Sequence, residues 1–242
     1  MAVLAKATQA MDLIARAPGP LRLADAATML GMPKSSAHRL LNELVEHDLL
    51  RRDNDGRFQL GIRLLSWGQS VEQSFDIRGI ALPHMQRLSA TTGETVNLHV
   101  LQGDHRVCLA TSRGANVLIP PVPIGQTLPL GIGATGKVLL AFTPDDLQAR
   151  IRDDLKQSGR AAVTDEELSR IRAAHWATSY HEQEIGLAAG ATVITGPGGR
   201  VVAALAVGGD VDHFTPERFD ELRPQLLQAA QSISHQLTGP AA

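Results

Sequence analysis

The segment of residues 33–45, PKSSAHRLLNELV, constrains the fold most, because its apolar residues repeat at the spacing of a helix. Positions i, i+3, i+4, i+7 and i+8 share one face of an α-helix. These positions hold Ala37, Leu40, Leu41, Leu44 and Val45. Ser35, Arg39 and Asn42 then point the opposite way, so the helix packs through one side and keeps a polar side free.

Two more helices are predicted before this segment. The first, near residues 3–16, ends at the breakers of residues 17–20, Ala-Pro-Gly-Pro. The second, near residues 23–30, stops at Gly31, a residue suited to a left-handed cap. Pro33 suits the first turn of the third helix, because its missing N–H would be unpaired there in any case.

A hairpin is predicted after the third helix. Two short strands, residues 49–52 and 57–60, flank the turn of residues 53–56, Asp-Asn-Asp-Gly. Asn, Asp and Gly tolerate the positive φ angles that a tight hairpin requires. Three helices followed by a hairpin predict a winged helix-turn-helix domain over residues 1–61.

The polar side of the third helix predicts that it enters the major groove of double-stranded DNA. Arginine can bridge guanine O6 and N7, serine suits a base edge or a phosphate, and a helix N-terminus favours phosphate. Acidic residues farther along, such as Glu43 and Glu46, restrict the contact to the first turns. The alternative is a solvated helix face in a dimerisation module. The candidate DNA-binding residues are Lys34, Ser35, Ser36, His38 and Arg39 on the helix and Arg57 on the wing.

The amino-acid composition limits the classes of protein to which this chain can belong. The chain has 242 residues, 43% of them hydrophobic, so it is long enough for two domains with a sizeable core. Its net charge of −2 argues against a large basic surface, so the cations must be concentrated where phosphates pass. The single cysteine, Cys108, excludes an intramolecular disulfide and indicates a reducing compartment. No apolar run could span a membrane, and we expect a cytoplasmic protein without membrane partners.

The rest of the chain predicts a linker helix over residues 62–77 and a second domain over residues 78–242. Its strands, helices and hairpins alternate in a way typical of an antiparallel α+β domain. The predicted strands are residues 95–101, 106–111, 128–133, 189–195 and 200–207. The predicted helices are residues 78–92, 136–142, 144–156, 165–174 and about 215–237, with a rigid extended loop at 119–123.

Several motifs in one order resemble the IclR family of bacterial transcriptional regulators. These motifs lie within residues 31–41, 50–61, 93–98, 128–137 and 199–205. The resemblance covers nearly the whole chain, from about residue 3 to residue 237. It implies an N-terminal winged helix-turn-helix and a C-terminal, GAF-like effector domain, an antiparallel sheet flanked by helices. It also implies assembly as dimers or tetramers on a pseudo-palindromic operator, with one recognition helix for each half-site.

The resemblance implies an effector site in the C-terminal domain. Unpaired N–H groups at the predicted start of the helix after residue 133 favour a carboxylate, with no arginine needed. Family members bind very small oxo-acids with Cys and Ser at the positions that Ala189, Ala206 and Gly208 hold here, so we expect a larger organic acid, aromatic acids included. The alternative is that these positions are sheet core. The candidate residues are Leu128, Ala134, Thr135, Gly136, Ser179, Glu182, Leu187, Ala189, Ala206 and Gly208.

No catalytic, metal or cofactor site is predicted. His99, His105 and Cys108 match no metal-binding spacing. A hydrolase-like enzyme with an appended DNA-binding domain is the alternative function, but Ser179 and the residues after it have no oxyanion hole assigned to them. Lys137 is expected to be a solvated helix residue.

Overall fold

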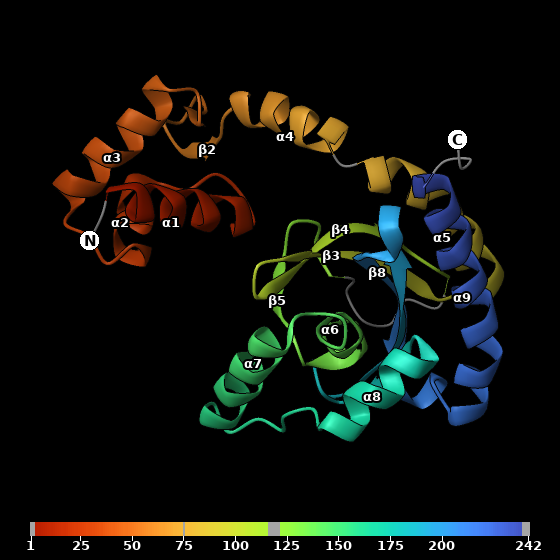
Figure 1. The fold of residues 1–242 in the computed structure, drawn as a ribbon. Helices are drawn as coiled ribbons and strands as arrows, with labels where there is room; N and C mark the ends of the chain where they lie inside the picture. The colour runs from red at the N-terminus through yellow and green to blue at the C-terminus, as the bar shows by residue number, and fades with distance from the viewer. Residues whose placement is uncertain (1–2, 75, 116–121, 239–242) are drawn as a thin grey trace. The chain divides into compact units, whose positions relative to one another are not determined.

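The computed structural model describes residues 3–74, 76–115 and 122–238 (Figure 1). The chain divides into two compact units, Met1–Phe75 and Asp76–Ala242. The predicted linker helix, residues 62–77, corresponds to the last helix of the first unit and the first two residues of the next helix. Most of the predicted loop at 119–123 lies outside the described residues.

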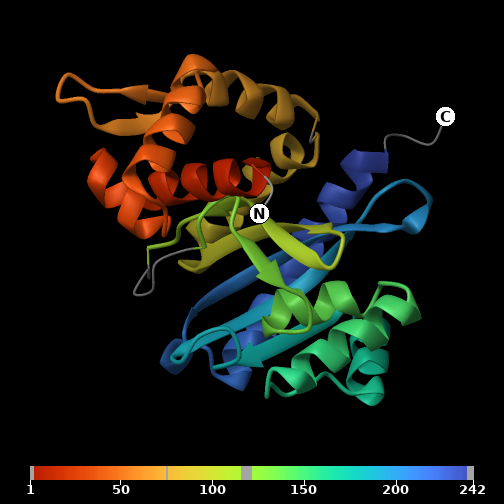
Figure 2. The ribbon, with the colours of Figure 1, turned by 90° about the vertical axis from the view of Figure 1, so that its left-hand side faces the viewer.

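The N-terminal unit is a winged helix-turn-helix domain, as predicted. Its elements are α1 (Val3–Arg16), α2 (Leu23–Met29), α3 (Lys34–Glu46), β1 (Leu50–Arg52), β2 (Phe58–Leu60) and α4 (Arg63–Ser74). The apolar face of α3 packs on α1, α2 and the hairpin, and its Leu41 is fully buried. Figure 2 shows the β1–β2 hairpin extending away from α3 as a wing.

The C-terminal unit contains an antiparallel sheet in the order β5-β4-β3-β8-β7-β6. The strands are β3 (Thr95–Gln102), β4 (His105–Ser112), β5 (Thr127–Pro129), β6 (Trp176–Tyr180), β7 (Leu187–Thr195) and β8 (Val201–Asp210). Because side chains alternate along a strand, each face of the sheet carries its own apolar core.

Helices cover both faces of this sheet (Figure 1). One face packs against α5 (Asp76–Thr92) and α9 (Pro216–Thr238), and the other against α6 (Gly133–Leu140) with α8 (Asp165–Ala174) beside it. The remaining helix, α7 (Asp145–Gln157), packs its Ile151 into the same core as α6. The fold class, an α+β chain with two domains, therefore agrees with the prediction.

The segment between β5 and α6 differs from the prediction. The expected strand over residues 128–133 ends at Pro129, and the helix expected from residue 136 begins at Gly133. Gly131 and Gly133 have φ angles of 75° and 69°, a left-handed conformation that ends a strand and that glycine adopts without strain. The earlier start of α6 changes which backbone groups lie at its N-terminus.

Candidate functional sites

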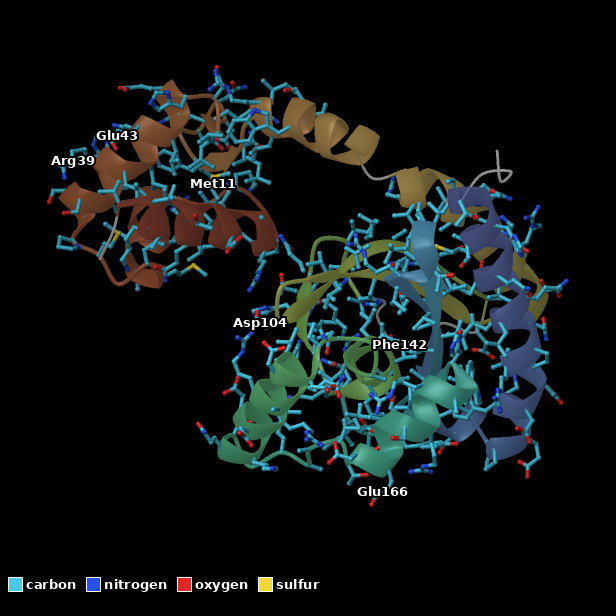
Figure 3. The ribbon with its side chains drawn as sticks, viewed as in Figure 1. Met11, Arg39, Glu43, Asp104, Phe142 and Glu166 are labelled. Atoms are coloured by element: carbon cyan, nitrogen blue, oxygen red, sulfur yellow. The ribbon has the colours of Figure 1, made fainter. Side chains whose placement is uncertain are left out.

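The outer side of α3 is exposed over its first turns. Lys34, Ser35, His38 and Arg39 are exposed and Ser36 is half-buried. In Figure 3, the labelled side chains of Arg39 and Glu43 both belong to α3. The structure therefore brings five of the candidate DNA-binding residues together on one accessible surface.

The wing is tied to α3 by polar contacts that the sequence did not indicate. The Asn42 amide lies 3.2 Å from Nε2 of His38, and the Arg52 guanidinium donates a hydrogen bond to Oδ1 of Asn42. Arg52 also lies over the Phe58 ring, 4.9 Å from its centre. Of these contacts, the Arg52–Asn42 hydrogen bond joins the hairpin to α3.

Arg57, the wing residue proposed to reach DNA, is half-buried. It forms an ion pair with Asp55, with 3.4 Å between Nη2 and Oδ2. Oδ1 of Asp53 accepts hydrogen bonds from the backbone N–H groups of Asp55 and Arg57. A phosphate that Arg57 contacts would therefore meet a guanidinium that already pairs with Asp55.

A cavity of about 300 Å³ lies between the sheet and the first turn of α6. We call it the α6 cavity. Of the candidate effector residues, it is lined by Leu128, Ala134, Thr135, Ser179, Leu187, Ala189, Ala206 and Gly208. Further wall residues, which the sequence did not single out, include Asn97, His99, Arg106 and Gln183. Gly136 and Glu182 do not line it.

Glu182 and Gly136 lie outside the wall of the α6 cavity. Oε2 of Glu182 accepts a hydrogen bond of 3.0 Å from the backbone N–H of Gly133 at the N-terminus of α6. The protein's own carboxylate thus pairs with the first N–H group of α6, while Ala134 and Thr135 at the same helix end line the α6 cavity. Gly136 lies within the helix, where a Cβ would stand 3.1 Å from the carbonyl oxygen of Pro129.

The expectation that Lys137 is solvated is wrong. Every residue of α6 is buried, so Lys137 has no solvated face to occupy. Its ammonium lies 2.7 Å from Oε1 of Glu182 and 3.0 Å from Oε1 of Glu167. The buried cation therefore joins α6 to α8 and to the loop between β6 and β7.

Replacing Lys137 with methionine should lower the free energy of unfolding by about 1–3 kcal/mol. The change leaves two carboxylates without their partner, and the loss is moderate because both are about one-third exposed and can be hydrated. Urea denaturation measures the loss. Lys156→Met is the matched control, since Lys156 and its partner Asp153 are both two-thirds exposed, and it should change stability by less than about 0.5 kcal/mol. Equal effects of the two substitutions would contradict this interpretation.

Arg106 supplies the positive charge of the α6 cavity. Nε donates a 3.1 Å hydrogen bond to the carbonyl of Pro129, and Nη2 donates to the carbonyl of Ile132 at 3.2 Å and to Oε1 of Gln183 at 2.8 Å. Among the described residues, no acceptor meets Nη1. Burial lowers the pKa of the guanidinium to about 10, which still leaves it charged at neutral pH.

The polar residues that line the α6 cavity besides Arg106 include His99, Asn97, Ser179 and Glu184. His99 is 2% exposed, and burial, with the nearby charge of Arg106, lowers its pKa to about 3, so its ring is neutral. Oδ1 of Asn97 accepts a 3.0 Å hydrogen bond from Thr111. Apolar walls are formed by alanine and leucine side chains together with Val122, Pro123 and Val207. A cation, a few polar groups and apolar walls are suited to an anion with an apolar body.

The alternative chemistries find little support. Within residues 3–74, 76–115 and 122–238, no three His, Cys, Asp or Glu side chains are placed to hold a metal ion. Cys108 is buried, which raises the pKa of its thiol. Glu182 is paired with Lys137, and Nδ1 of His181 accepts a hydrogen bond from the Gly186 N–H, so neither orients the other for catalysis on Ser179. No helix in the described ranges is long and apolar enough to cross a bilayer.

Comparisons with known proteins cover both units. The family model "IclR helix-turn-helix domain" matches residues 3–54, and "Bacterial transcriptional regulator IclR C-terminal" matches residues 69–235. The chain is 32% identical to the HTH-type transcriptional regulator KipR of Bacillus subtilis over 224 residues, 90% of each chain.

Two solved structures have the same fold. The IclR of Thermotoga maritima is 28% identical, with a TM-score of 0.79 over 98% of each chain. An IclR homologue from Microbacterium hydrocarbonoxydans, complexed with 4-hydroxybenzoate, has a TM-score of 0.81 at 22% identity over 98% of this chain and 99% of its own. This chain belongs to the IclR family of bacterial transcriptional regulators, with a helix-turn-helix domain that binds DNA and a C-terminal domain that binds an effector.

Proposed function

We propose that the first turns of α3 enter the major groove of an operator and that the wing contacts the adjacent backbone. The observation that supports this is the exposed polar surface of α3 opposite a largely buried apolar face. Arg39 reads a base edge, and Lys34 with the helix N-terminus binds phosphate. The proposed contact residues are Lys34, Ser35, Ser36, His38, Arg39 and Arg57.

Replacing Arg39 with alanine should weaken specific operator binding by about 1–3 kcal/mol, because the bond to a base edge is lost. Fluorescence anisotropy on a duplex selected from a random library measures the change. Arg170→Ala removes an equal charge from the exposed surface of α8 and should leave the affinity unchanged. If Arg39→Ala binds like the wild type, the proposed docking of α3 is wrong.

We infer that the effector is a small organic acid, aromatic acids included, bound in the α6 cavity. The observation that carries this is Arg106, a buried cation whose Nη1 has no acceptor in the described protein, beside apolar walls. A cavity of about 300 Å³ lies at the lower end of the range for ligand sites. The 4-hydroxybenzoate complex of the Microbacterium homologue adds support through the shared fold.

We further propose that the protein acts as a dimer or tetramer in the cytoplasm, where its operator lies, and controls a catabolic operon. A pseudo-palindromic operator requires one recognition helix for each half-site.

We propose no catalysis, because Glu182 and His181 form hydrogen bonds to other groups and not to Ser179. Mass spectrometry of a bound acid after prolonged incubation tests this, and a product that forms with the protein would favour the enzyme.

A further inference from the structure

His99 is a buried side chain without any hydrogen bond. Both ring nitrogens are inaccessible to solvent, and neither finds a partner within the described part of the chain. Leaving such groups unpaired inside a protein costs free energy, so unpaired buried groups are rare. His99 also lines the α6 cavity, so a turn of its ring about the Cβ–Cγ bond would present a nitrogen to a molecule bound there.

The position of His99 relates it to Arg106. On β3, Leu101 pairs with Arg106 and His99 pairs with Cys108, so the two side chains lie on neighbouring strands two positions apart. Both are more than nine-tenths buried and both contribute to the wall of the α6 cavity. The cavity thus presents a cation and, a short distance along the sheet, a neutral imidazole.

Arg106 and the His99 ring require different hydrogen-bonding partners. Arg106 offers only donors and matches a carboxylate. A neutral imidazole has one N–H donor and one acceptor nitrogen, and a hydroxyl group can satisfy either of them. Leu128, Leu187 and Ala189 form apolar walls that suit the carbon skeleton joining the two ends of a ligand.

We propose that His99 is a specificity-determining residue, and that the α6 cavity selects hydroxy acids, with the carboxylate on Arg106 and a hydroxyl group on the His99 ring. This inference rests on the proposed function of the same cavity. In the competing arrangement, one carboxylate contacts both Arg106 and His99, and a hydroxyl group elsewhere on the ligand adds nothing.

Isothermal titration of the full-length protein with matched acids separates these arrangements. The probes are benzoate with 3- and 4-hydroxybenzoate, and phenylacetate with 4-hydroxyphenylacetate. In the wild type, at least one hydroxylated acid should bind about fivefold to a hundredfold more tightly than its parent acid, because the parent leaves the His99 ring unpaired.

Two variants assign this preference to His99. His99→Leu should reduce the ratio of the two affinities to about one, and His99→Gln, whose amide donates and accepts, should keep part of it. His99→Leu removes an unpaired buried polar ring, so we expect it to fold, and its thermal melt checks this. The ratio of the affinities for the hydroxylated acid and its parent acid is compared within each variant. It therefore reports on His99 even if the substitution changes both affinities.

The outcomes are distinct. If each parent acid binds the wild type as tightly as its hydroxylated partners, the proposed role of His99 is wrong. The proposed acid site is not affected by that result. A preference that survives in His99→Leu also overturns the proposed role of His99. If no acid of either kind binds the wild type, the proposed acid site itself fails and the inference fails with it.

Discussion

Replacing Arg106 with methionine should lower the affinity of the C-terminal domain for organic acids by about 2–4 kcal/mol, a factor of roughly 30 to 1,000. Arg106 is buried, so a carboxylate that pairs with it loses hydration and depends on the guanidinium for compensation. Methionine has similar length and apolar volume but offers no donor.

The design must separate binding from folding, because Arg106 also holds the carbonyl groups of Pro129 and Ile132. Titrations are therefore made well below the melting temperature of each variant. Arg106→Lys keeps the charge without the forked donors and should retain intermediate affinity. Arg150→Met, on the exposed surface of α7, is the control and should bind like the wild type. Full acid affinity in Arg106→Met would show that the ligand lies elsewhere.

Protonation of His99 should destabilise the C-terminal domain when the pH falls from above 6.5 to 3. The upper limit of this loss of stability is about 4–5 kcal/mol. The pKa of His99 is about 3 in the folded protein and about 6.5 when unfolded. Between these values the unfolded chain binds a proton that the folded chain does not, so protonation favours unfolding. Above pH 6.5 both states are neutral and the contribution vanishes.

Carboxylates also titrate in this pH range, so the effect of His99 is measured as the difference in stability between the wild type and a variant without the histidine. Urea denaturation of the wild type and of His99→Leu is compared from pH 7 to pH 4. The difference between the two stability curves should be constant near neutral pH and should grow as the pH falls, because the variant loses less stability. Parallel curves would show that His99 takes up its proton in the folded state at an ordinary pKa.

The N-terminal fold could be predicted in detail because its signals are local. Helical spacing in residues 33–45 and turn chemistry in residues 53–56 each depend on neighbours in the chain. The start of α6 could not be predicted, because it depends on Gly131 and Gly133 adopting left-handed conformations between β5 and the helix. Nothing in the local pattern distinguishes those glycines from strand glycines.

The site was harder to predict than the fold. The positions carried over from the family resemblance gave much of the wall of the α6 cavity, and their role in binding stays a prediction. Arg106 follows Asp104 and His105 and looks like part of a solvated hairpin. Its partners, Pro129, Ile132 and Gln183, lie 23, 26 and 77 residues away. Such contacts exist only after the sheet forms.

The most direct test measures operator affinity at fixed salt with and without a saturating acid that binds the α6 cavity. Salt must be fixed because phosphate contacts release counterions. The acid should change the dissociation constant by about 5- to 150-fold, and Arg106→Met should bind the operator yet show no change. An operator affinity that is the same with and without bound acid, or a chain that binds no duplex at low ionic strength, would contradict the account.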